Sequence, residues 1–92
     1  MAFDYGYSEE FLDTLKKIRK RHKPLFEATL KKIDEIISRD KETIEYYKNL
    51  RNDLNNSKRV HVLKHYVLMF TINKKENHIL FQKLRHHDEA YK

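Results

Sequence analysis

Six histidines among 92 residues are the most chemically active feature of this sequence. Five of them gather in the C-terminal third, at positions 61, 65, 78, 86 and 87. Cationic side chains lie close to them along the chain, among them Arg59 and Arg85. Histidine exchanges protons near neutral pH, and neighbouring cations can neutralise a phosphate. The combination favours acid–base chemistry on a phosphodiester.

Cleavage of RNA without a metal needs three kinds of group, and this cluster contains all of them. A base takes the proton of the ribose 2′-OH, cations stabilise the charged phosphorane, and an acid protonates the departing 5′-oxygen. Arg59 and His61 are two residues apart and therefore share a strand face, while His87 has the parity of Lys83 and Arg85. Single exposed histidines are also commonly just solvated surface residues.

A second interpretation is that the same histidines are ligands of a zinc ion. The residues that could converge on it are His61, His65, His86, His87 and Asp88. Neighbouring lysines and arginines would repel a divalent cation and suit a phosphate, so we expect no metal and no cofactor.

Composition narrows the remaining function classes. The sequence has no cysteine, and Gly6 is its only glycine, which argues against thiolate catalysis and phosphate-binding loops. A net charge of +6 and a pI near 9.5 favour a polyanionic partner, whether nucleic acid, an anionic membrane surface or an acidic protein. The N-terminus lacks the layout of a signal peptide and no apolar stretch is long enough to span a membrane, so we expect a cytoplasmic protein without membrane association.

The first half of the chain predicts a strand and a helical hairpin, within one domain over residues 1–92. Alternating aromatic residues predict a strand over 2–7, and Ser8 is a suitable N-cap for a helix over 9–21. Pro24 begins a second helix over 24–39, and the short connection makes the two helices antiparallel. Residues 40–50 are ambiguous, with one helical turn possible at 42–47, and residues 54–57 form a turn.

From residue 58 onward, the apolar residues repeat with a period of two instead of a helical period. We expect a strand around Val60 and Val62, a central strand over 66–72, a hairpin loop over 73–77, a third strand over 78–84 and a polar tail over 86–92. His61 and His65 flank the turn at 63–64 and should lie near each other. The predicted fold is α+β, in the order β-α-α-β-β-β. An antiparallel meander carries the first strand at its edge and the helical hairpin on one face, with a core of aromatic residues at positions 11, 26, 66, 70 and 81.

This order, with residues 16–37, 47–54, 58–70 and 86–91, resembles the RelE/ParE superfamily of toxins, and in particular the histidine-using, YafQ-like mRNA interferase branch. The resemblance covers nearly the whole chain. Its most specific parts are R-x-H-x-x-x-[D/H]-[aromatic], which begins at Arg59, and H-x-[D/E]-x-[aromatic], which ends at Tyr91. It implies a RelE-like fold and the toxin of a type II toxin–antitoxin system, which cleaves mRNA on the ribosome and leaves a 2′,3′-cyclic phosphate. It also implies an antitoxin partner, RelB-like and acidic.

The resemblance also assigns roles by position. His61 and His87 fall on histidines of that branch, His65 falls where the branch has an aspartate, and Lys48 falls about where it has another histidine. The proton-transfer pair could therefore be His61 with His87, or His65 could act itself. The catalytic candidates are Arg59, His61, His65 and His87, and the RNA-binding candidates are Lys48, Arg51, Lys58, Lys64, Arg85, His86 and Tyr91. The alternatives are a ParE-like toxin that inhibits DNA gyrase through protein contacts, and an inactive relative that only binds RNA or a partner.

Overall fold

The fold, a computed structural model, is described over residues 3–49 and 57–90. Its elements follow the chain in the order β1 (Asp4–Tyr7), α1 (Glu9–Arg21), α2 (Lys23–Ile37), the 3-10 helix η1 (Thr43–Tyr46), β2 (Lys48–Asn49), β3 (Ser57–Val62), β4 (Tyr66–Asn73), β5 (His78–His86) and α3 (His87–Ala90).

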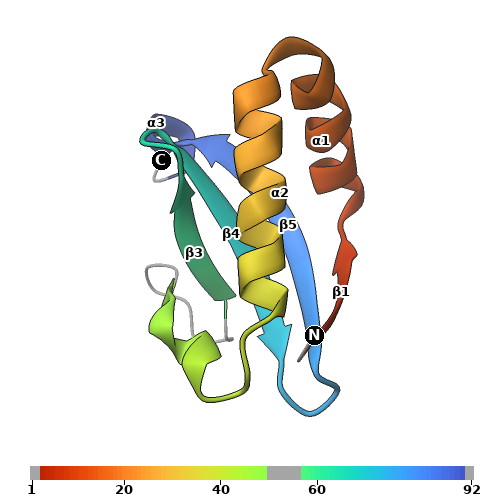
Figure 1. The fold of residues 1–92 in the computed structure, drawn as a ribbon, viewed down its shortest axis with the longest axis vertical. Coiled ribbons are helices and arrows are strands. Elements are labelled where there is room, and N and C mark those ends of the chain that lie inside the picture. Colours follow the sequence, from red (N-terminus) through yellow and green to blue (C-terminus); the bar gives the residue numbers. More distant parts are fainter. Residues whose placement is uncertain (1–2, 50–56, 91–92) are drawn as a thin grey trace.

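One sheet and one helical hairpin form two layers (Figure 1). The strand order is β1-β5-β4-β3-β2, in which β1 runs parallel to β5 and the other neighbours are antiparallel. Both long helices cover the same face of the sheet. The predicted α+β class and the β-α-α-β-β-β order are confirmed, including the first strand at the edge of the meander.

Local capping explains where the helices begin. The Ser8 hydroxyl accepts a hydrogen bond from the Phe11 backbone N–H at 3.0 Å, so α1 begins where the sequence predicts. His22 separates the two helices and caps α2 through Nδ1, which accepts from the Leu25 N–H at 3.4 Å. The second helix ends at Ile37, two residues before the predicted end. None of the helices over 3–49 and 57–90 has the length and apolarity needed to cross a membrane.

The core lies between the hairpin and the sheet. Phe11, Phe70 and Phe81 are fully buried there, as their parity predicts, while Phe26 and Tyr66 are partly buried and pack at its border. Aromatic rings contact one another across the layers, for example Phe11 of α1 and Phe81 of β5 with centroids 6.1 Å apart.

Two differences from the sequence prediction lie between the hairpin and the meander. The ambiguous segment forms η1 and then β2, which pairs Lys48 with Arg59 and Asn49 with Lys58. A two-residue strand is too short for any periodicity to reveal. Ser57, predicted as the end of a turn, begins β3 instead, and the rest of that predicted turn lies outside the described residues.

The last strand also differs, because β5 continues to His86 and the predicted tail then forms α3. A β-bulge interrupts β5: Phe70 faces Phe81, but the next pair is Met69 with Lys83, so Gln82 is the extra residue. Before the bulge, odd-numbered residues of β5 such as Phe81 face the helices. After it, even-numbered residues such as Leu84 face them. Ser8 fixes this point, since its backbone N–H donates to the Phe81 carbonyl at 2.9 Å and its hydroxyl donates to the Gln82 carbonyl at 2.7 Å.

Candidate active site

The sheet face opposite the helices carries two rows of paired residues. One row is Lys48, Arg59, Met69 and Lys83, and the other is His61, Val67 and Arg85. Directly paired residues of neighbouring antiparallel strands point to the same side of a sheet. Because both rows alternate with core residues such as Val62 and Leu68, they must face away from the helical hairpin.

Each row has an apolar centre and cationic or imidazole side chains around it. Val67 and Met69 belong to this outer face and are nevertheless buried, with 0% and 7% exposure. The helix α3 contacts both β4 and β5, and the Nε atom of Arg59 is buried on β3. Lys48 and Lys83 are exposed, and Arg59 is half-buried. This layout presents positive charge around a dry strip of the sheet.

Two histidine rings meet on this face. His61 and His87 stack with their centroids 5.7 Å apart and their planes inclined by 20°. His87 begins α3, and its backbone N–H donates to the His65 carbonyl at 2.6 Å, which anchors α3 to the turn between β3 and β4. The exposed carboxylate of Asp88 lies 3.9 Å from Nδ1 of His87 and 3.8 Å from Nδ1 of His86. Two neighbouring imidazoles are thus available for proton transfer.

A groove runs from His61 toward η1. It has a volume of about 360 Å³ and is lined by Tyr46, Tyr47, Lys48, Arg59, Val60 and His61. Lys48, which the sequence places far from the strands, comes to this groove through β2 and its pairing with Arg59. Tyr46 is absent from the candidates derived from the sequence, because nothing in the local pattern shows that η1 borders this groove.

His65 and His86 form a second stacked pair, with centroids 5.9 Å apart. His86 alternates with Arg85 and contacts the ring of Tyr66, which in turn contacts His22 at the start of α2. This pair therefore lies toward the helices rather than on the outer face. The rings of His61 and His65, which the sequence predicts to lie near each other, thus stack on two different histidines, His87 and His86.

Lys58, which the sequence analysis counts among the RNA-binding candidates, is buried in the structure. Its side chain is only 3% exposed, and its Nζ lies 2.8 Å from Oε2 of Glu45. Alternation along β3 puts Lys58 on the helix side when Arg59 faces out, so it is not presented to a ligand of the outer face. Lys64 is exposed in the turn between β3 and β4. Arg51 and Tyr91 lie outside the described residues.

Arg85 links the outer face to α1. Its Nη2 lies 2.9 Å from Oε2 of Glu10, and this hydrogen bond is the main reason that the pKa of Glu10 lies below its ordinary value. The contact holds the guanidinium beside the first turn of α1. Among the residues that the structure describes, no three histidine or carboxylate side chains converge in a way that could hold a metal ion.

The fold recurs in solved structures of bacterial toxins. The YoeB dimer of Staphylococcus aureus superposes with a TM-score of 0.76 at 14% identity, over 95% of this chain and 99% of that one. The RelBE toxin–antitoxin complex of E. coli gives 0.70 at 19% identity, over 90% and 94%. The E. coli DinJ–YafQ complex gives 0.65 at 17% identity, over 98% and 99%. These likenesses establish the fold and leave the YafQ-like branch a prediction.

Sequence similarity identifies the family. No protein-family model matches the chain. "Putative toxin RelE4" of Methanocaldococcus jannaschii is 42% identical over 78 residues, which are 85% of this chain and 79% of that protein. An uncharacterised protein of Methanosarcina mazei is 39% identical over 75 residues, or 82% and 83% of the two chains. The chain belongs to the RelE family of toxins.

Proposed function

We propose that this toxin is an endoribonuclease that cleaves mRNA on the ribosome, in the cytoplasm, by acid–base catalysis without a metal ion. The observation that carries the proposal is the stacked pair His61–His87 on the outer face, beside the rows that contain Arg59 and Arg85. Two proton-transfer groups next to fixed cations are what cleavage of a phosphodiester by its own 2′-OH requires.

The proposed reaction uses one histidine as base and the other as acid. The base removes the proton of the ribose 2′-OH, and the 2′-oxygen forms a bond to the adjacent phosphorus. The bond from phosphorus to the 5′-oxygen breaks, and the acid donates a proton to that leaving oxygen. The products are a 2′,3′-cyclic phosphate and a 5′-hydroxyl. Both rings end with their protons exchanged, and solvent restores the starting state.

The cations stabilise the charge that develops on the phosphorane. Arg59 is well suited to contact a non-bridging oxygen, because it lies next to His61 on the same face of β3. Lys48 and Arg85 extend the positive rim to either side of this position and can bind flanking phosphates. The proposal retains His61, His87 and Arg59 as catalytic, and leaves His65 outside the reacting pair.

An antitoxin is the proposed protein partner. Solved relatives of the fold include toxin–antitoxin complexes, such as RelBE of E. coli and YoeB–YefM of S. aureus. The toxin carries a formal charge of +6, which favours an acidic, RelB-like segment and rapid association. Co-expression with a neighbouring gene should give a co-purifying complex and relieve the growth arrest caused by the toxin alone.

The proposal is tested by cleavage of mRNA in a purified translation reaction, with cut sites mapped by toe-printing. His87→Ala and His61→Ala should each lower the cleavage rate on the order of 10²- to 10⁴-fold, the usual contribution of an acid or base. His78→Ala is the matched control, because His78 lies at the other end of β5, opposite Asp4 of β1. Its cleavage rate should equal that of the wild type.

Three outcomes would contradict parts of this scheme. Unchanged cleavage by His87→Ala would remove the assigned pair, and a cleavage rate that rises with added Zn²⁺ or Mn²⁺ at constant Mg²⁺ would favour a metal. Equal cleavage of naked mRNA and ribosome-bound mRNA would remove the dependence on the ribosome.

A further inference from the structure

Tyr46 is an exposed aromatic residue at the border of the candidate active site. It is 78% exposed, more than any other large hydrophobic residue that the structure describes. It nevertheless lines the groove that contains Lys48, Arg59 and His61. The ring therefore lies in water beside cationic side chains and takes no part in the core.

The ring is held in place by Arg39. The guanidinium carbon of Arg39 lies 5.0 Å from the centroid of Tyr46 and 4.7 Å from that of Tyr47, and the two tyrosine rings contact each other edge to face at 6.0 Å. Arg39 can cover only one face of the Tyr46 ring. The high exposure of the residue therefore leaves the other face open to solvent.

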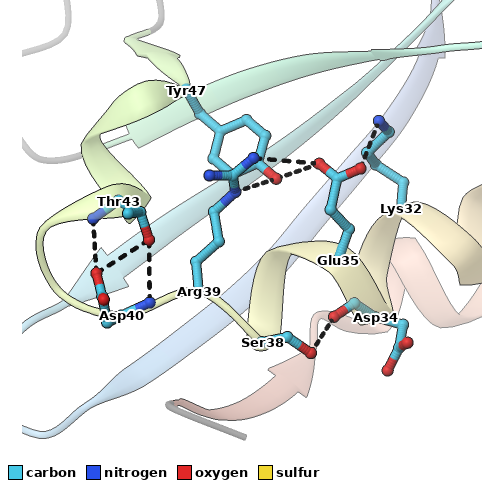
Figure 2. A network of polar contacts seen from close by, with 8 residues as sticks. All are labelled: Lys32, Asp34, Glu35, Ser38, Arg39, Asp40, Thr43 and Tyr47. Atoms are coloured by element: carbon cyan, nitrogen blue, oxygen red, sulfur yellow. Dashed lines mark hydrogen bonds and ion pairs between the residues drawn. The ribbon is translucent and has the colours of Figure 1, made fainter.

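Arg39 is itself fixed by a network that reaches α2 (Figure 2). Its Nε donates to the hydroxyl of Tyr47 at 2.8 Å, and that hydroxyl donates to Glu35, which also pairs with Lys32 at 3.2 Å. Burial and the bond to Glu35 raise the pKa of Tyr47 to about 12, so the hydroxyl keeps its proton.

The turn before η1 is fixed as well. One carboxylate oxygen of Asp40 accepts from the backbone N–H and the hydroxyl of Thr43, at 2.8 and 3.0 Å (Figure 2). The chain that carries Tyr46 is thus anchored both at its start and through Tyr47. A preorganised ring loses little entropy when a flat ligand stacks on it.

We propose that Tyr46 is a stacking platform for a nucleobase of the RNA, on the Lys48 side of the cleaved phosphodiester. The inference rests on the proposed ribonuclease function and adds a subsite to it. The groove offers cations from β2 and β3 and an open aromatic ring from η1. Single-stranded RNA matches this pairing, because it presents a phosphate and an unstacked base in each nucleotide.

The first test measures binding without cleavage. A short fluorescent RNA with 2′-O-methyl groups cannot react, and its affinity is followed by anisotropy. Tyr46→Ala should bind on the order of ten- to a hundredfold more weakly, whereas Tyr46→Phe and Tyr46→Trp should keep the affinity of the wild type. Tyr5→Ala is the matched control, since Tyr5 is an exposed tyrosine on β1, at the opposite edge of the sheet. It should bind like the wild type.

The second test asks whether the ring contacts a base. Abasic nucleotides are placed one by one along the same RNA. At one position, removing the base should weaken RNA binding to the wild type as much as Tyr46→Ala weakens binding of the intact RNA. The same abasic RNA should bind to Tyr46→Ala as well as the intact RNA does. Abasic substitutions at other positions should weaken the wild type and Tyr46→Ala equally.

The outcomes separate this inference from the proposed reaction. If no abasic position is coupled to Tyr46, or if Tyr46→Phe loses as much affinity as Tyr46→Ala, the stacking subsite is refuted even when the toxin cleaves RNA. If coupling is found and the wild type cleaves nothing, the subsite stands and the proposed catalysis fails. Loss of antitoxin binding in Tyr46→Ala, with RNA affinity unchanged, would assign the ring to the protein partner and overturn the inference.

Discussion

Replacing Glu45 should destabilise the fold more than replacing the lysine that it neutralises. Lys58 is 3% exposed and Glu45 is 45% exposed, with Nζ and Oε2 2.8 Å apart. Glu45→Gln leaves the charge of Lys58 buried without a counter-charge, while Lys58→Met removes the charge and keeps the length of the side chain. Glu45 also pairs with Lys74 at 2.6 Å, so it retains a partner when Lys58 is replaced.

The size of the effect follows from the burial of the two groups. Breaking a fully buried ion pair costs about 3–5 kcal/mol. Because Glu45 is half-exposed and glutamine can still accept a hydrogen bond, we expect Glu45→Gln to lower the free energy of unfolding by about 2 kcal/mol, or roughly 10 °C in Tm for a domain of this size. Lys58→Met should change it by less than about 1 kcal/mol, since an apolar replacement of a buried charge is often neutral.

The assay is unfolding by urea and by heat, followed by circular dichroism, for both single variants and the double variant. The double variant should match Lys58→Met to within about 1 kcal/mol, because only the exposed pair with Lys74 is still lost once the buried charge is gone. Equal losses in the two single variants would refute the reasoning.

The pH dependence gives an independent check. Hydrogen bonds from Lys58 and then Lys74 lower the pKa of Glu45 in the folded state below its ordinary 4.5. The stabilisation is therefore complete above that ordinary pKa and is lost as the pH falls through the lower folded value. The difference in stability between wild type and Glu45→Gln should shrink as the solution is acidified below pH 4.5. A difference that stays constant to the acid limit of folding would contradict this assignment.

Three further predictions concern other contacts of the fold and the site. Ser8→Ala removes the N-cap of α1 and the bond to Gln82, and it should cost about 1–2 kcal/mol in urea unfolding, with Ser8→Thr close to wild type. Tyr47→Phe leaves Arg39 and Glu35 without their shared hydroxyl, and it should lower Tm by roughly 5 °C in a thermal scan. Lys48→Met should reduce the salt dependence of RNA binding by about one phosphate contact in an anisotropy titration, whereas Lys58→Met should leave it unchanged.

The parts of the fold that the sequence predicts are those with local causes. Ser8 and the carboxylates after it predict where α1 begins, and the short connection before Pro24 predicts the hairpin. Alternation in the second half predicts the meander and puts Arg59 and His61 on one face, as the strand pairing confirms. The burial of Lys58 has a signal of the same kind, because Lys58 shares the parity of Val60 and Val62.

The parts that it does not predict depend on contacts between distant segments. Two residues cannot show a strand period, so the pairing of Lys48 with Arg59 comes only from the sheet. The stacking of His65 on His86 and of His61 on His87 depends on where β5 ends and α3 begins. The position of the Tyr46 ring depends on its contact with Arg39, and Arg39 pairs with Glu35 of α2.

The bond between Ser8 and the bulge at Gln82 joins positions 74 residues apart, and it has a consequence for the synthesis of the protein. The strand that neighbours both β1 and β4 is β5, which is made after the other strands that the structure describes. A nascent chain that ends before β5 has no partner for β1, no bulge and no His87. Pairing of such distant segments is also slow to form, because the intervening chain must be ordered first. The proposed site can therefore form only after β5 and His87 have been made, later than every other strand of the described sheet.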